Sequence, residues 1–299
     1  MSARHSRWSD EPRRDSAGKP IPIRFGENDL EVCKLLASST VCRAPWSYQY
    51  LPSTYIPAIL QRGDALKRRL DWLTDEPNWY VQRPVQPRNL SRELIYALDK
   101  RGADELREAG IEVPKYRLRP LPHELMACLC AASFEIGARA HGLPIRTHEW
   151  PIANPRPDWV PFQLGTGLIL LEADTGSETL YSREDATTIS GKFDQYLQLI
   201  HDGSLRRVFR TKDVLVLFVT TRPTRRDSMI EVLKKVIDGL GLEHELAEHF
   251  AFSAIKYDRY LNTLPKPSDW IVTSDHLRAG FGPINFVSRI VHNSNGERR

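Results

Sequence analysis

The first third of the chain places its hydrophobic residues at helical spacing in three segments. Residues 27–37 repeat them at intervals of three and four, which predicts a helix. Residues 53–73 predict a longer helix with weak points at Pro57 and Gly63, and its last part separates an apolar face from a basic one. Residues 100–110 predict a short helix that ends at its final glycine, a residue common just past a helix end.

Two short strand-like pieces lie between the second and third of these helices. They are "NWYVQRP" and "RELIYALD", separated by the polar, proline-rich "VQPRNLS". The order helix, helix, basic helix, two-stranded wing, helix is that of a winged helix-turn-helix, in which the basic helix enters the major groove and the wing touches phosphates. The residues expected to contact DNA are Lys67, Arg68, Arg69, Arg83, Lys100 and Arg101. The alternative is an amphipathic helix pair with solvated lysines and arginines.

Strands and helices alternate over the rest of the chain. The pattern predicts a long apolar helix over residues 123–142, strands over 145–150, 168–173, 214–220, 249–254 and 269–277, and helices over 186–200 and 227–239. This alternation predicts a mixed α/β domain.

Charge is unevenly distributed along the chain. Residues 1–120 carry 21 lysines and arginines against 16 aspartates and glutamates, whereas the remainder carries 21 against 22. A basic first part favours a nucleic-acid-binding protein, and double-stranded DNA is the expected partner.

The ends of the chain and its cysteines point to a cytoplasmic protein with no membrane partner. No segment approaches the ~18 consecutive apolar residues of a membrane span. Residues 1–24 lack an apolar core and predict a disordered charged leader rather than a secretory signal, and residues 286–299 predict a disordered tail. The cysteines show no zinc-binding spacing, so we expect reduced, buried thiols at Cys33, Cys42, Cys128 and Cys130.

The candidate chemistry lies in "RPDWVPFQLGTGLILLEAD", residues 156–174. Side chains two apart on a strand share a face, so Glu172 and Asp174 point the same way. Two carboxylates at the end of a buried strand are costly without a partner, and a divalent cation would remove that cost. A hairpin turning at Gly165–Gly167 would bring Asp158 beside them. Three carboxylates suit Mg²⁺ or Mn²⁺, which prefer oxygen ligands.

Lys192 and Tyr196 lie one helical turn apart on the helix that follows this strand. A lysine near a metal-bound water can orient it and stabilise developing phosphate charge. Tyr196 is either a packing residue or a nucleophile that holds a DNA 5′-phosphate. The alternative for Glu172 and Asp174 is a solvated strand end, or pairing with arginines such as Arg183 or Arg206.

The segments "RPDWV", "LILLEADTGSET" and "GKFDQYLQLI" resemble the plasmid replication-relaxation family, which includes mobilisation relaxases of the MobC type. The family pattern has a proline-aspartate, a strand ending in glutamate-x-aspartate followed by threonine or glycine, and a helix bearing lysine and tyrosine. The matching residues are Asp158, Glu172, Asp174, Lys192 and Tyr196. His123 matches a histidine that begins a further helix in the family.

The resemblance implies an N-terminal winged helix, residues 25–112, followed by a domain similar to the PD-(D/E)xK restriction-endonuclease fold, residues 113–285. It implies metal-dependent nicking or relaxation of DNA at an origin-like site, with replication or mobilisation proteins and a second copy of the chain as further partners. In the restriction-enzyme pattern a lysine stands two residues after the glutamate, where this chain has Asp174. The catalytic set is therefore complete only if Lys192 reaches back from its helix, and the alternative is a winged-helix DNA-binding regulator or accessory factor with a silent nuclease-like domain.

Overall fold

The fold is mixed α/β with two separate sheets. The computed structural model describes residues 14–19, 21–37, 48–63, 65–84, 94–113, 120–181, 188–211, 213–257, 264–268 and 270–286. Cys42, Arg183 and most of the expected leader, wing tip and tail lie outside these residues. The chain divides into two compact units, one formed by residues 1–86 and 93–116 and the other by residues 87–92 and 117–299. Assigning these units as DNA-binding and nuclease-like domains stays a prediction.

In its described residues, the N-terminal unit combines four helices with a three-stranded antiparallel sheet. In chain order the elements are α1 (Glu27–Leu36), β1 (Leu51–Pro52), α2 (Tyr55–Leu60), α3 (Ala65–Thr74), β2 (Val81–Gln82), β3 (Ile95–Leu98) and α4 (Lys100–Glu108). The strand order is β1-β3-β2, with β3 paired to both neighbours. The sequence pattern did not predict β1, where Pro52 lies on an edge strand, a position that tolerates the missing N–H.

The single helix expected over residues 53–73 is two helices. Gln61 adopts a left-handed conformation with φ of 52°, and Gly63 follows before α3 begins. Pro57 lies in the first turn of α2, where its missing N–H costs no helical hydrogen bond. The break therefore falls at Gly63, one of the two weak points indicated by the sequence, and not at Pro57.

The C-terminal unit is built on a five-stranded mixed sheet. Its elements are α5 (Leu121–Ala140), β4 (Ile145–Thr147), β5 (Phe162–Leu164), β6 (Gly167–Asp174), α6 (Ile189–His201), α7 (Ser204–Phe209), β7 (Val214–Thr220), α8 (Pro223–Leu240), the 3-10 helix η1 (His244–His249), β8 (Phe250–Ala254) and α9 (Trp270–Thr273). The strand order is β4-β5-β6-β7-β8, antiparallel from β4 to β6 and parallel from β6 to β8. The strand expected over residues 269–277 is wrong, because α9 occupies its first half and only isolated bridges follow.

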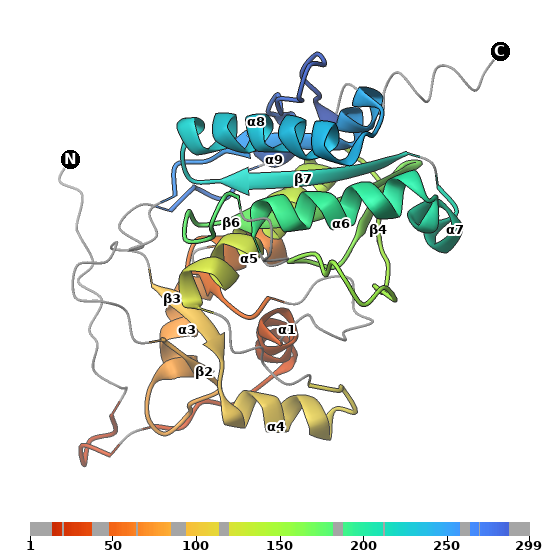
Figure 1. The fold of residues 1–299 in the computed structure, drawn as a ribbon. Coiled ribbons are helices and arrows are strands. Elements are labelled where there is room, and N and C mark those ends of the chain that lie inside the picture. The colour runs from red at the N-terminus through yellow and green to blue at the C-terminus, as the bar shows by residue number, and fades with distance from the viewer. Residues whose placement is uncertain are drawn as a thin grey trace. The chain divides into compact units, whose positions relative to one another are not determined.

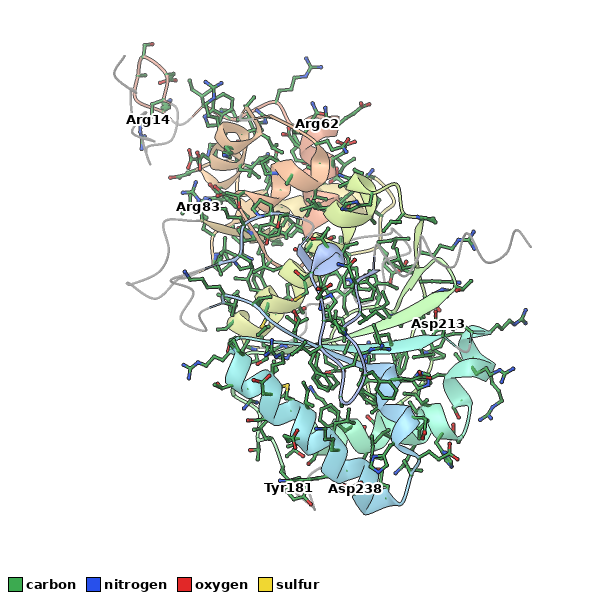
Figure 2. The ribbon with its side chains drawn as sticks, turned by 90° about the horizontal axis from the view of Figure 1, so that it is seen from above. Arg14, Arg62, Arg83, Tyr181, Asp213 and Asp238 are labelled. Carbon is green, nitrogen blue, oxygen red and sulfur yellow. The ribbon has the colours of Figure 1, made fainter. Side chains whose placement is uncertain are left out.

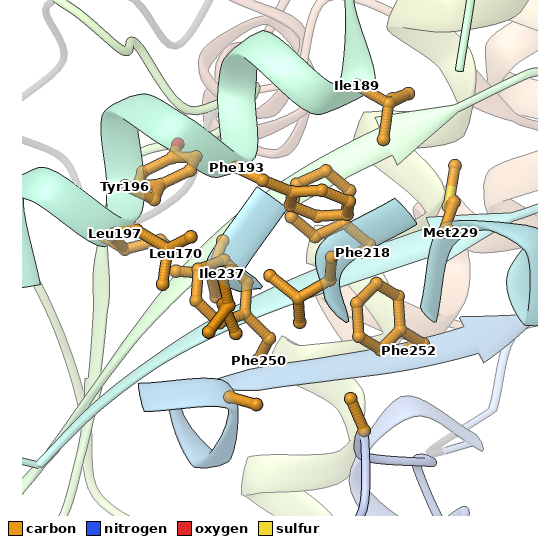
Figure 3. Close-up of a cluster of buried hydrophobic side chains, with 14 of the residues drawn as sticks. Leu170, Ile189, Phe193, Tyr196, Leu197, Phe218, Met229, Ile237, Phe250 and Phe252 are labelled. Carbon is orange, nitrogen blue, oxygen red and sulfur yellow. The ribbon is translucent and has the colours of Figure 1, made fainter. Parts of the chain in front are cut away.

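The two parallel connections determine which helices cover which face. Parallel crossovers are right-handed, so two successive crossovers in one direction place α6 and α8 on the same face of the sheet. Figure 1 shows both helices running alongside β7. Their shared core contains Leu170 of β6, Phe193 of α6 and Phe218 of β7, with edge-on aromatic contact between the two phenylalanine rings (Figure 3). Helix α5 packs on β6 as well, so both faces of this central strand are covered.

Three cysteines fall within the described residues, and all are buried without a disulfide there: Cys33, Cys128 and Cys130. Burial, followed by the charges of Asp29 and Glu105, raises the pKa of the Cys33 thiol to about 12. Among the described helices none is long and apolar enough to cross a membrane.

Candidate functional site

The end of β6 carries two deeply buried carboxylates. Glu172 and Asp174 are each 1% exposed, and they lie on the face that also contributes Leu168 and Leu170 to the core under α6 and α8. A buried carboxylate is strongly disfavoured unless hydrogen bonds or an opposite charge compensate it. The partners of these two side chains therefore determine what the site can do.

Glu172 is held by two residues of helix α6. Tyr196 donates its hydroxyl to Glu172 Oε1 at 2.6 Å, and Lys192 Nζ lies 2.9 Å from Oε2. Thr188 caps the helix by accepting from the Gly191 N–H, which places Lys192 in the first turn and beside the strand end. The spacing of four residues puts the amine and the phenol on one helical face, and both reach the same carboxylate.

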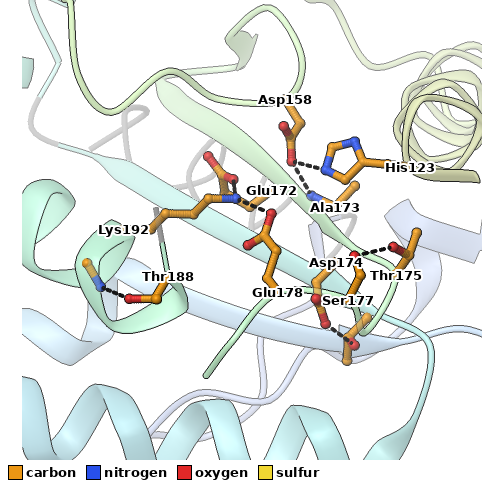
Figure 4. Close-up of polar contacts among 12 residues, drawn as sticks. His123, Asp158, Glu172, Ala173, Asp174, Thr175, Ser177, Glu178, Thr188 and Lys192 are labelled. Carbon is orange, nitrogen blue, oxygen red and sulfur yellow. Dashed lines mark hydrogen bonds and ion pairs between the residues drawn. The ribbon is translucent and has the colours of Figure 1, made fainter. Parts of the chain in front are cut away.

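A second carboxylate reaches the same amine. Glu178, in the loop that follows β6, places Oε1 3.1 Å from Lys192 Nζ (Figure 4). Glu172 Oε2 and Glu178 Oε2 are buried and accept no hydrogen bond from the described residues. Lys192 contacts Glu172 Oε2 as an ion pair at 2.9 Å. The cluster therefore places two carboxylates, those of Glu172 and Glu178, against one ammonium.

Asp158 lies in the segment just before β5 and bonds to the backbone of β6. Its main-chain N–H donates to Leu171 O at 3.0 Å, and its Oδ2 accepts from the Ala173 N–H at 2.9 Å. His123 of α5 lies 3.4 Å from the same oxygen. The β5–β6 hairpin turns at residues 165–166, so Asp158 does come to lie beside the strand end that carries Glu172.

Asp174 belongs to a different set of contacts. Arg225, in the first turns of α8, donates to both of its oxygens, with Nη2 2.8 Å from Oδ1. Thr220 donates to Oδ2 at 2.7 Å and the Gly176 N–H to Oδ1 at 3.1 Å. The pairing of Asp174 with an arginine matches the alternative raised from the sequence, although the partner among the described residues is Arg225 and not Arg206, and Arg183 lies outside those residues.

The structure therefore brings Asp158, Glu172, Lys192 and Tyr196 together and directs Asp174 to Arg225. Within the described ranges, no three histidine, cysteine, aspartate or glutamate side chains are already arranged as a metal-binding group. A cation bound here would have to compete with the Lys192 ammonium for the same oxygens.

The electrostatics of the cluster differ from those of isolated side chains. Burial raises the pKa of Glu172 to about 7, with a further upward contribution from Asp158, although Lys192 opposes the shift. Burial lowers the pKa of Lys192, but the carboxylates of Glu172, Asp158 and Glu178 outweigh it and raise the value above the ordinary range. Burial and then the Glu172 carboxylate raise the pKa of Tyr196 well above that of a free phenol.

The sequence profile of the replication-relaxation family matches residues 49–215. The chain belongs to the replication-relaxation family. No curated protein and no solved structure gives a significant match. The matched region of this replication-relaxation protein contains the whole Glu172 cluster, but it ends before Arg225, the residue that neutralises Asp174.

Two residues of the site were not expected from the sequence, and a third had no predicted role. Glu178 follows the strand in "DTGSET", and no regular spacing relates it to Glu172. Arg225 could have been found, because β7 runs parallel to β6 and the residues just past its end must lie beside Asp174. His123, which had only a match to the family pattern and no expected role, contacts Asp158.

The residues expected to contact DNA fall into two groups. Arg68, Lys100 and Arg101 are exposed, and Lys67 is half-buried on α3. Arg69 and Arg83 are instead engaged within the unit, with Asp29 and Asp71 respectively. Arg101 also donates to Pro77 O at 2.7 Å, and its guanidinium lies 4.4 Å from the ring centroid of Tyr80. A bound phosphate could reach the exposed group without breaking a buried ion pair.

Proposed function

We propose that this replication-relaxation protein binds duplex DNA of a plasmid or mobile element and nicks it with the help of a divalent metal ion. In this proposal the N-terminal unit is a winged helix and the C-terminal unit is a PD-(D/E)xK-like nuclease domain. The observation that carries it is the meeting of Asp158, Glu172 and Lys192 at one strand end from three separate segments of the chain.

The winged-helix assignment is supported by element order and strand pairing. A helix, a short strand, two helices and a two-stranded ribbon follow one another, and β3 lies between β1 and β2. Helix α3 is the recognition helix, and its exposed Arg68 with Lys67 supplies phosphate contacts. Lys100 and Arg101 at the start of α4 and Arg83 beside the ribbon extend the basic surface.

The donor set at the strand end fits Mg²⁺ or Mn²⁺ by charge and by ligand type. The Lys192 ammonium contacts Glu172 and Glu178 and feels the charge of Asp158, and two oxygens of this set accept no hydrogen bond from the described residues. Asp158 and Glu172 would hold the ion, with Glu178 in place of the Asp174 that Arg225 engages. Such an ion supplies a nucleophilic water at neutral pH and stabilises charge on a phosphoryl oxygen.

The side chains of the site have separate roles in this proposal. Lys192, which lies beside Glu172 and Glu178, would stabilise negative charge developing on the phosphate. Tyr196 orients Glu172 through its short hydrogen bond. Its complete burial and raised pKa favour this positioning role over attack on DNA.

The test is nicking of supercoiled plasmid in Mg²⁺ or Mn²⁺ by wild type, Glu172→Gln and the matched variant Asp174→Asn. We expect Glu172→Gln to abolish nicking while leaving duplex affinity unchanged, and Asp174→Asn to retain nicking. Loss of nicking in Asp174→Asn with its fold intact would return Asp174 to the metal site.

A second function, a DNA-binding regulator with a silent nuclease-like domain, is favoured by one observation. The position of the usual catalytic lysine holds Asp174, neutralised by Arg225. Absence of nicking by wild type with every divalent metal, together with duplex binding, would support this second function.

Under either function, neutralising Lys67 and Arg68 reduces the salt dependence of duplex binding, because each lost phosphate contact lowers the slope by roughly one.

A further inference from the structure

The N-terminal unit contains a pocket between the start of α1 and helix α3, with a volume of about 810 Å³. This volume lies within the range of about 300–1,000 Å³ that small-molecule sites occupy. The charged and aromatic residues of its wall are Arg24, Arg62, Arg68, Arg69 and Trp72 together with Glu27 and Asp29. Four guanidinium groups and two carboxylates therefore line the pocket.

Two of the four arginines are already neutralised. Arg69 is bound to Asp29, and Arg62, labelled in Figure 2, forms an exposed ion pair with Glu31 at 3.1 Å. Arg24 and Arg68 are exposed, and neither forms an ion pair with another described residue. The positive charge available to a ligand is therefore concentrated on these two side chains.

The pocket also offers a flat aromatic wall. Trp72 is half-buried, and the Arg69 guanidinium lies 5.9 Å from its ring centroid. Nucleobases stack on such rings, and arginine forks bind phosphate oxygens in pairs. The Arg69–Asp29 pair also fixes the wall of the pocket near Arg24, because Arg69 Nη2 donates to Arg24 O at 2.8 Å.

We propose that this pocket binds a nucleotide, with its phosphate on Arg24 and Arg68 and its base against Trp72. The nucleotide is either free or part of a DNA strand, since the two present the same phosphate ester beside a planar base. Binding needs neither the metal nor the carboxylate cluster of the C-terminal unit. Its failure and the failure of the proposed nicking activity are therefore separate results.

The experiment is isothermal titration of the full chain without metal, using AMP, inorganic phosphate and a short random-sequence DNA duplex as probes. The test variant is Arg24→Ala/Arg68→Ala. Its control is Lys34→Ala/Arg107→Ala, which removes the same charge from exposed positions of the same unit outside the pocket. We expect AMP to bind wild type and the control alike, and to bind the test variant at least about tenfold more weakly, as loss of charge-assisted hydrogen bonds requires.

The remaining measurements distinguish a free nucleotide from a DNA strand and control for misfolding of the variants. Weaker binding of inorganic phosphate than of AMP, with the difference removed by Trp72→Leu, supports base stacking. No binding of AMP, together with a tenfold loss of duplex affinity in the single variant Arg24→Ala, whose residue is outside the DNA contacts proposed above, assigns the pocket to a strand phosphate. Arg24→Lys/Arg68→Lys keeps the charge but loses the fork, so we expect intermediate binding. Equal behaviour of test and control variants with every probe would overturn the proposal.

Discussion

Glu172 and Asp174 stand two residues apart on one face of β6, yet they occupy opposite kinds of environment. Asp174 has both oxygens bound by Arg225, with additional donors from Thr220 and Gly176. Glu172 has one phenolic donor and one ammonium, and its Oε2 accepts no hydrogen bond from the described residues. A fully compensated carboxylate stabilises the fold, whereas an incompletely compensated one can exchange its partner for a ligand.

This comparison shows that a carboxylate pair in a sequence is not yet a site. The alternation of a strand places both side chains on one face, but the helices that arrive there decide their chemistry. Helix α6 brings a lysine and a tyrosine to Glu172, and α8 brings an arginine to Asp174.

The largest effect is expected from Arg225→Ala. Removing this guanidinium leaves Asp174 buried without a countercharge, and breaking such a pair costs about 3–5 kcal/mol. We expect chemical denaturation to show that loss in the free energy of unfolding of the C-terminal unit. Arg226→Ala, one residue further along α8 and paired with the exposed Asp227, is the control and should change stability by less than about 0.5 kcal/mol. Equal losses in the two variants would remove the contrast between Asp174 and Glu172.

The next effect concerns the pH dependence of stability. Folding raises the pKa of Glu172 from 4.5 to about 7, so between these values the folded carboxyl retains a proton that the unfolded one has lost. The stability that this proton gives is full below pH 4.5 and is lost as pH rises through about 7. Between pH 4.5 and about 7 the free energy of unfolding of the wild type should fall by about 3 kcal/mol at most. We expect Glu172→Gln to abolish this decline.

Asp174→Asn is the matched comparison for that titration, since it leaves Glu172 in place. Metal-free unfolding curves at several pH values should show the wild-type slope in Asp174→Asn and a flatter one in Glu172→Gln. A slope that survives the Glu172→Gln change would mean that another group carries it.

A smaller effect is expected from Tyr196→Phe. The variant loses one hydrogen bond to Glu172 and leaves Oε1 without a partner, at a cost of about 1–3 kcal/mol. Because that bond favours the charged carboxylate, its loss should move the titration of Glu172 to higher pH. We expect nicking to persist, measured on supercoiled plasmid. A covalent protein–DNA adduct that forms with wild type and is absent from Tyr196→Phe would instead make this residue the nucleophile.

The smallest change in stability is expected from Glu178→Gln. This side chain is 23% exposed and Lys192 keeps Glu172 as its partner, so the free energy of unfolding should change by less than about 1 kcal/mol. Its effect on metal binding should be larger, measured as Mn²⁺ affinity by titration. Unchanged Mn²⁺ affinity would exclude Glu178 from the metal site.

Local pattern was sufficient for most of the elements that build the site. The apolar run before Glu172, the glycines at 165 and 167, and the four-residue spacing of Lys192 and Tyr196 predicted the hairpin, the buried strand and the helical face. These features depend on neighbours in the sequence, where periodicity and turn chemistry are informative.

What could not be predicted depends on contacts between distant segments or on local conformations that the residue types leave open. Asp174 and Arg225 are separated by 51 positions, and only the parallel pairing of β6 with β7 brings them together. The split between α2 and α3 depends on Gln61 adopting a left-handed conformation, which nothing in its residue type requires. Residues 269–277 contain a short apolar run that predicts a strand but supplies α9, since such a run does not by itself distinguish helix from strand.

The way Asp158 is held matters for any attempt to inactivate the protein cleanly. Strand β5 pairs with β6 only as far as Ile169, and beyond it Asp158 satisfies Leu171 O with its own N–H and the Ala173 N–H with its carboxylate. Truncating this side chain to alanine would uncover a backbone donor on a strand flank, the kind of group through which chains recruit one another into aggregates. Loss of a preparation to self-association could then be mistaken for loss of the proposed nicking activity, whereas asparagine, which still offers an oxygen to the Ala173 N–H, would keep that donor paired.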